Sequence, residues 1–116
     1  MKVSGCLTIQ NRTPEVSRQV ADSFRLPGNY LDELIVVLDT ATKEARDGAH
    51  EAYDGLPFPV RFITIPGEPR WKCPAQAWNF AYTAATGDLL YCISSEVVQA
   101  DDNVEKAKEL CKNLDL

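Results

Sequence analysis

The stretch Glu33–Leu38, which reads Glu-Leu-Ile-Val-Val-Leu, decides the fold of this chain. It is apolar on both faces of an extended backbone, a pattern typical of a central strand that helices cover on both sides. Asp39-Thr40-Ala41-Thr42 leaves this strand. A polar helix follows from about Lys43 to Tyr53, and Gly55-Leu56-Pro57 ends it.

The rest of the sequence alternates strands and helices in the same way. Thr13-Pro14-Glu15 indicates a helix start, with Thr13 as the N-cap and Pro14 at the first helical position. Asp102 and Glu105 have the spacing of a capping box for the last helix. The expected strands are residues 2–9, 33–38, 60–65 and 88–93, and the expected helices are residues 13–24, 43–53, 74–86 and about 102–114.

Four successive strand–helix units imply a parallel sheet with right-handed crossovers and helices on both faces. We therefore expect one α/β domain over residues 1–116, a three-layer, Rossmann-like sandwich around a mainly parallel four-stranded sheet.

The composition argues against several classes of ligand and location. The net charge of −5 argues against binding to nucleic acid or to anionic membranes, which depends on basic patches. One histidine and four cysteines without a Cys-x-x-Cys pair disfavour zinc, and we expect reduced, mostly buried thiols. There is no apolar run of the roughly 20 residues that span a bilayer. The start of the chain carries no secretory leader pattern, so a cytoplasmic location is expected.

In a parallel sheet, ligands bind outside the carboxyl ends of the strands. The segments to consider are therefore residues 8–12, 39–42, 65–73 and 94–98. Neither Gly-x-Gly-x-x-Gly nor a P-loop occurs in the chain. A nucleotide would have to be bound by side chains, strand-end backbone and a metal ion.

Each candidate residue has a plainer alternative. Arg12 could meet a phosphate or be a solvated surface arginine. Asp39 could accept from a base N–H or a ribose hydroxyl, or could cap a turn. Arg70 and Lys72, on either side of Trp71, could offer positive charge to a nucleotide or form an ordinary surface loop.

Glu96 follows the last strand after two serines. A single carboxylate beside open coordination positions suits Mg²⁺ or Mn²⁺ shared with substrate phosphates, and the alternative is an exposed glutamate. No Ser/His/Asp or Cys/His arrangement is convincing in a chain with one histidine.

Five segments resemble, in order, motifs of family 2 glycosyltransferases of the GT-A fold. Residues 7–12 (Leu-Thr-Ile-Gln-Asn-Arg) are similar to the end of the family's first strand, and residues 33–41 to its second strand. Residues 75–79 and 84–88 are similar to its Ala-x-x-Asn and Ala-x-Gly-Asp motifs. The Asp-x-Asp metal signature falls on residues 94–96, Ser-Ser-Glu.

The resemblance implies roles for these residues. Thr8 and Gln10 would approach the nucleobase and ribose, and Asp39 would read the base, commonly the N3–H of uracil. Arg70 or Lys72 would face the base or the diphosphate.

Three further positions complete the expected site. Arg12 and Ser95 belong to the nucleotide-binding set. Glu96 would be the ligand of Mn²⁺ or Mg²⁺, while Ser94 stands where the family has its first aspartate. The resemblance also implies the strand order 3-2-1-4.

The expected function is that of a metal-dependent glycosyltransferase that binds a nucleotide-diphosphate sugar, with a UDP-sugar as the expected donor. The resemblance implies that the chain corresponds to the N-terminal, donor-binding half of the family. No residue here matches the family's catalytic base, and a second copy or a partner domain could supply the acceptor site. The alternatives are a non-catalytic nucleotide-sugar-binding or regulatory module of the same fold, or an unrelated flavodoxin-like or Rossmann-like domain that binds no nucleoside diphosphate.

Overall fold

The strands form one parallel sheet in the order β3-β2-β1-β4 in a computed structural model that describes residues 1–70 and 73–114. The strands are β1 (Val3–Ile9), β2 (Glu33–Asp39), β3 (Val60–Ile65) and β4 (Leu89–Cys92). The parallel sheet is the one that the strand–helix pattern predicts, and its order is the one that the resemblance implies. Every residue of β2 is buried, as predicted for the central apolar stretch.

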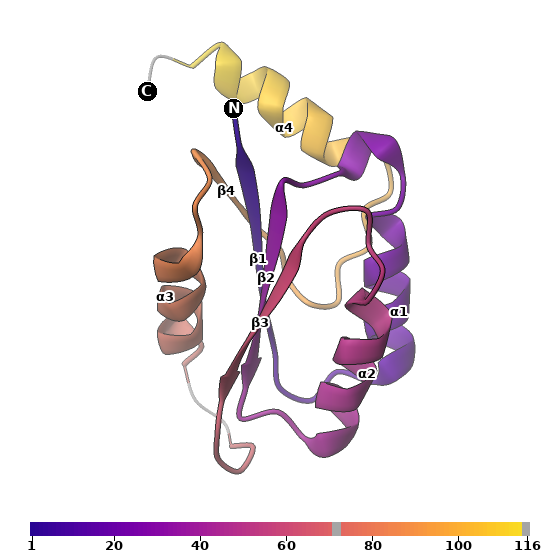
Figure 1. Ribbon diagram of the computed structural model, residues 1–116, viewed down its shortest axis with the longest axis vertical. Coiled ribbons are helices and arrows are strands. Elements are labelled where there is room, and N and C mark those ends of the chain that lie inside the picture. Colours follow the sequence, from indigo (N-terminus) through magenta and orange to yellow (C-terminus); the bar gives the residue numbers. More distant parts are fainter. Residues whose placement is uncertain (71–72, 115–116) are drawn as a thin grey trace.

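Helices cover both faces of this sheet, so the three-layer α/β prediction is confirmed. Figure 1 shows α1 (Pro14–Ser23) and α2 (Lys43–Tyr53) on one face and α3 (Ala75–Ala84) on the other. The last helix, α4 (Asn103–Lys112), lies at the end of the sheet where β1 begins and packs against the short 3₁₀ turn η1 (Pro27–Asn29).

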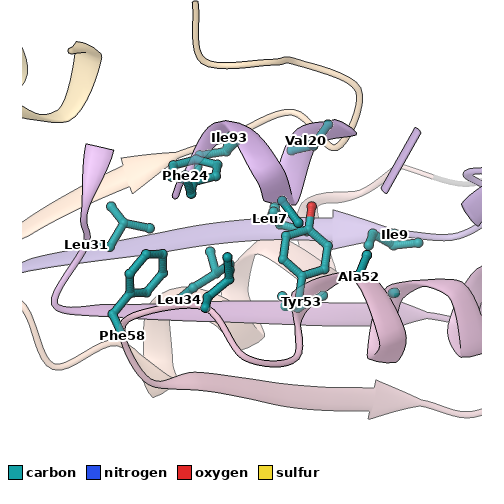
Figure 2. Close-up of a cluster of buried hydrophobic side chains, with 14 of the residues drawn as sticks. Leu7, Ile9, Val20, Phe24, Leu31, Leu34, Ala52, Tyr53, Phe58 and Ile93 are labelled. Carbon is teal, nitrogen blue, oxygen red and sulfur yellow. The ribbon is translucent and has the colours of Figure 1, made fainter. Parts of the chain in front are cut away.

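The main hydrophobic core lies between the sheet and the pair α1–α2. Figure 2 shows Leu7 and Leu34 of the sheet near Phe24 and Tyr53 of the helical layer. The opposite face has a smaller core, in which Cys6, Ile35 and Val37 pack under Ala77 and Ala81. The small side chains of α3 let this helix lie close to the sheet, and they bury less apolar surface than the aromatic side chains opposite.

The local sequence explains where the helices begin. Thr13 accepts a hydrogen bond from the N–H of Val16 at 3.3 Å, and Thr42 accepts one from the N–H of Ala45 at 3.1 Å, as N-cap side chains do. The capping-box prediction for Asp102 is wrong, because its side chain makes no capping bond.

The N–H of Val104 at the start of α4 is satisfied from another element. It donates to Oδ1 of the buried Asn29 at 3.3 Å. Asp101 accepts from the N–H of Asp102 at 2.8 Å and pairs with Lys106. The cap of α4 is therefore a tertiary contact with η1, which sequence spacing along α4 could not reveal.

At the amino-terminal end of the sheet, Glu33 joins three strands to the segment after α3. Its carboxylate accepts from Ser4 Oγ at 2.5 Å, from Arg61 Nη2 at 2.9 Å, and from the N–H and hydroxyl of Thr86 at 2.7 and 2.8 Å. Burial raises the pKa of Glu33, but these hydrogen bonds outweigh burial and lower it to about 2. Glu33 is therefore a charged structural residue at the end opposite the expected ligand site.

All four cysteines are free, as expected, but only Cys6 is buried. Burial, followed by the proximity of Cys92 and Glu33, raises the pKa of the Cys6 thiol to about 11, so this thiol is unreactive. The expectation of mostly buried thiols is wrong: Cys73 and Cys92 are exposed. The reason for Cys92 is that β4 is an edge strand of the described sheet.

Candidate functional site

A cleft of about 290 Å³ opens at the carboxyl end of the strands, the place where the parallel sheet predicts a ligand. Strands β1 and β2, the start of α3 and the segment after β4 all contribute to it. The described residues that line it are Thr8, Ile9, Gln10, Asn11, Arg12, Asp39, Pro74, Trp78, Ser94 and Ser95.

Gln10, which follows β1, connects the ends of two strands with a loop. Its Nε2 donates to Thr40 Oγ1 at 2.9 Å and to the carbonyl oxygen of Arg70 at 3.1 Å. Its own carbonyl accepts from the N–H of Thr42 at 2.9 Å. Gln10 therefore fixes the position of the turn after β2 beside the cleft.

Arg12 lies between the cleft and the segment after β4. Its Nε donates to Ser95 Oγ at 2.9 Å, and its Nη2 lies 2.7 Å from Glu96 Oε2. Ser95 is buried, whereas the side chains of Arg12 and Glu96 are 40% and 48% exposed. The serine holds one edge of the guanidinium in place, and the partly exposed glutamate neutralises the other.

Glu96 stays ionised in this arrangement. The hydroxyl of Ser94 donates to Glu96 Oε2 at 2.9 Å, and this bond, together with the charge of Arg12, lowers the pKa of Glu96. Both neighbours contact the same carboxylate oxygen. The three residues form a small charge-paired cluster at the rim of the cleft.

Asp39 ends β2 and reaches the cleft as a buried residue. The next residue, Thr40, has a positive φ of 46°, which is rare for a residue with a branched side chain. Its N–H donates to the carbonyl of Ile65 at 3.0 Å, and its hydroxyl donates to the carbonyl of Asp39 at 2.7 Å. The strained turn directs the chain away from the sheet, and Asp39 lies in the cleft lining just before it.

Arg70 borders a neighbouring hollow of about 250 Å³. Thr40, Pro66, Gly67 and Glu68 form the rest of its wall. The carbonyl of Arg70 is tied to Gln10, so this loop lies next to the cleft, while the exposed side chain is absent from the described cleft lining. Lys72, the other basic residue expected in this loop, lies outside the described residues.

The structure thus brings most of the predicted site residues to one place. Five of them line the cleft itself: Thr8, Gln10, Arg12, Asp39 and Ser95. Glu96 reaches this group through its contact with Arg12. These six residues therefore lie together at the carboxyl end of the sheet.

Five lining residues were absent from the predicted set, namely Ile9, Asn11, Pro74, Trp78 and Ser94. Trp78 packs against the smaller core and also borders the cleft. Its place near the start of a helix that follows the third strand could have suggested this. Figure 1 shows α3 beginning toward the same end of the sheet.

The residues around Glu96 do not fit a divalent cation held by the protein. No group of three or more His, Cys, Asp or Glu side chains that could hold a metal occurs within residues 1–70 and 73–114. Glu96 is already paired with a guanidinium at 2.7 Å. Arg12 would repel a cation bound to that oxygen. In addition, Mg²⁺ and Mn²⁺ sites use several oxygen ligands.

Comparison with known proteins adds no relative. No protein-family model matches the chain, and no curated protein is similar enough to count as a match.

Within the part of the chain that the structure describes, no helix is long and apolar enough to cross a membrane.

Proposed function

We propose that this chain is the donor-binding half of a glycosyltransferase that resembles family 2 and uses a nucleotide-diphosphate sugar, with a UDP-sugar as the favoured donor. The observation that carries the proposal is the shared cleft at the carboxyl end of the sheet, where Arg12 and Asp39 lie with Thr8, Gln10 and Ser95. This is the region in which open α/β sheets bind ligands.

The cleft offers different chemistry to the two ends of such a donor. Asp39 is a buried acceptor in the cleft lining, suited to a base N–H or a ribose hydroxyl. Trp78 supplies an aromatic side chain to the same lining. Arg12 supplies positive charge and several donors for phosphate oxygens. We therefore orient the nucleoside toward Asp39 and the diphosphate toward Arg12.

In the proposed reaction, the bond between the sugar's anomeric carbon and the diphosphate oxygen breaks as an acceptor hydroxyl forms a new bond to that carbon. The hydroxyl loses its proton, and the nucleoside diphosphate leaves with the bonding electrons. Arg12 would stabilise the charge that develops on the leaving diphosphate. A second copy or a partner domain would supply the acceptor site and the base.

A divalent cation is the cofactor that the resemblance implies, and Glu96 is the residue expected to hold it. When bound, Mn²⁺ or Mg²⁺ supplies charge stabilisation for a leaving diphosphate. Because Glu96 is paired with Arg12 and has no neighbouring group of metal ligands within residues 1–70 and 73–114, no step of the proposed reaction is assigned to the metal.

The second candidate is a non-catalytic nucleotide-sugar-binding module. One observation favours it: among the described residues that line the cleft, the only carboxylate is Asp39, which we assign to donor binding. Turnover distinguishes the two candidates. The enzyme releases UDP from a UDP-sugar, whereas the module binds the donor and leaves it intact.

Calorimetric titration of the purified chain with UDP tests the binding proposal. We expect saturable binding that weakens at least about tenfold in Asp39→Asn, because the negative charge is lost and one of the two acceptor oxygens becomes an NH₂ donor. The matched control is Asp54→Asn, at an exposed aspartate just after α2, which should bind UDP like the unmodified chain.

No binding at millimolar UDP would contradict the proposal and favour an unrelated Rossmann-like domain. If UDP binds, UDP-sugars are then incubated with candidate acceptors and UDP release is measured. Binding without any release would support the non-catalytic module.

A further inference from the structure

We propose that Arg12 is the diphosphate-binding residue of the cleft and that Glu96 is an internal competitor, which the diphosphate displaces from Arg12 without a metal ion on Glu96. This inference rests on the proposed nucleotide-binding function of the same cleft. It assigns Glu96 the opposite role from the metal ligand that the sequence suggests.

Arg12 is held ready for an anion. Because Arg12 follows the central strand β1 and its Nε donates to the buried Ser95 at 2.9 Å, the guanidinium has a fixed edge. Its Nη2 points to Glu96 Oε2 at 2.7 Å. Among the described residues that line the cleft, Arg12 is the only cation, and we therefore assign the diphosphate to its guanidinium.

Glu96 is an exchangeable partner for Arg12. Both side chains are partly exposed, at 40% and 48%, and ion pairs of this kind contribute little because water and salt screen them. A diphosphate presents more negative charge and more acceptor oxygens, and arginine binds phosphate with two parallel hydrogen bonds. The carboxylate can then turn outward into solvent.

The hydrogen bonds of Glu96 Oε2 support competition between Glu96 and a diphosphate for Arg12. Glu96 Oε2 receives hydrogen bonds from both Arg12 and Ser94, at 2.7 and 2.9 Å. Release of Glu96 therefore frees a guanidinium N–H and a serine hydroxyl together. Both groups can donate to phosphate oxygens, and the guanidinium has no lone pair with which to coordinate a divalent cation.

The two roles of Glu96 predict opposite signs for one substitution. Glu96→Gln removes the competing charge and strengthens diphosphate binding if Glu96 is a competitor. The same substitution removes a ligand and weakens binding if Glu96 holds a metal. Arg12→Gln weakens binding only if Arg12 is the anion partner, and Arg12→Lys keeps the charge but loses the two-pronged geometry.

The experiment is calorimetric titration with UDP, inorganic pyrophosphate and uridine, each in EDTA and each with MnCl₂. In EDTA, we expect Glu96→Gln to tighten UDP and pyrophosphate binding by about two- to fivefold. We expect Arg12→Gln to weaken both by at least about tenfold and Arg12→Lys to weaken them less. Uridine binding should be unchanged in all three variants.

Charge-matched controls are Glu51→Gln on α2 and Arg18→Gln on α1, both at exposed positions of the helical layer. Neither should change the affinity. Circular dichroism spectra establish that each variant is folded, and Arg12→Lys carries the test if Arg12→Gln is not.

Three outcomes separate the inference from the proposed function. Weaker UDP binding in Glu96→Gln, together with a requirement for Mn²⁺, overturns the inference and leaves the proposed function standing. Pyrophosphate binding that responds as expected without any binding of UDP or uridine supports the anion site and overturns the nucleotide function. Absence of binding for all three probes overturns both.

Discussion

Two glutamate–arginine pairs lie at opposite ends of the sheet, with contact distances of 2.9 Å for Glu33–Arg61 and 2.7 Å for Glu96–Arg12. The side chain of Glu33 is 8% exposed and that of Glu96 is 48% exposed. Glu33 accepts four hydrogen bonds from other described residues, and Glu96 accepts two.

The contact distance does not distinguish the two pairs; burial and the number of other partners do. A buried carboxylate with several donors leaves those donors unsatisfied when it is removed, which makes it part of the structure. A partly exposed carboxylate beside a cleft can be replaced by water or by a ligand at low cost.

Removal of Glu33 is expected to have the largest effect. Glu33→Ala should lower the free energy of unfolding by about 4 kcal/mol, because Ser4 and the N–H of Thr86 lose their acceptor inside the protein. Urea denaturation measures this change. The matched control, Glu96→Ala, should change it by less than about 1 kcal/mol. Equal losses of stability in the two variants would contradict the conclusion that Glu33 is structural and Glu96 is exchangeable.

The pH dependence of stability should follow Glu33. Its pKa is lowered from 4.5 to about 2 in the folded protein, so its stabilisation is present above pH 4.5 and is lost as the pH falls toward 2. Linkage gives a loss of about 3 kcal/mol over that range. Urea denaturation at a series of pH values measures the loss.

The two glutamates should differ in this titration. Glu96→Gln should retain the acid loss, and Glu33→Gln should lack most of it. In the reverse result, Glu96→Gln would remove the loss of stability at acid pH and Glu33→Gln would retain it. That result would show that Glu96, and not Glu33, is the structural carboxylate.

Gly87 tests how tightly the amino-terminal network is packed. A Cβ at this position would lie 2.6 Å from Ser4 Oγ, and the N–H of Gly87 donates to that same hydroxyl at 2.8 Å. Gly87→Ala should therefore cost about 2 kcal/mol of stability through overpacking. Thermal denaturation measures it.

Gly55 is the control for Gly87, because nothing lies within 4 Å of a Cβ built there and its φ is +74°. Gly55→Ala should cost only the backbone strain, about 1 kcal/mol. A larger cost for Gly55 than for Gly87 would contradict the packing argument.

The smallest expected effect is the coupling between Arg12 and Glu96. A double-mutant cycle of Arg12→Gln and Glu96→Gln should give a coupling free energy below about 1 kcal/mol, and it should shrink further in 0.5–1 M salt, roughly the range where screening is strong. A coupling as large as the effect of removing Glu33 would make the Arg12–Glu96 pair structural and remove the basis for exchange.

The sequence predicted the parts of this molecule that depend on local pattern. The run of apolar residues around Val36 identified the central strand, and Thr13 with Pro14 identified the start of α1. The candidate residues after β1, β2 and β4 converge because parallel strands bring their carboxyl ends to one edge.

The long-range contacts of the two glutamates could not be predicted from the sequence. Arg12 and Glu96 are 84 positions apart, and Glu33 is 53 positions from Thr86, so only the packed sheet reveals these contacts. The sequence alone therefore indicates a single carboxylate at Glu96 and does not reveal its ion pair with Arg12. The cap of α4 was missed for the same reason, because Asn29 is 75 positions from Val104.

The chain that follows Glu96 is fastened to the rest of the protein. The N–H of Gln99 donates to Ser23 Oγ at 3.0 Å, and its side chain accepts from the hydroxyl of Tyr91 at 2.8 Å. With the backbone anchored so close, Glu96 can leave Arg12 by rotation of its own side chain. Such rotations take picoseconds to nanoseconds, whereas collective rearrangements take microseconds or longer. The encounter with an anion would then be limited by diffusion and orientation, with no slow opening step before it.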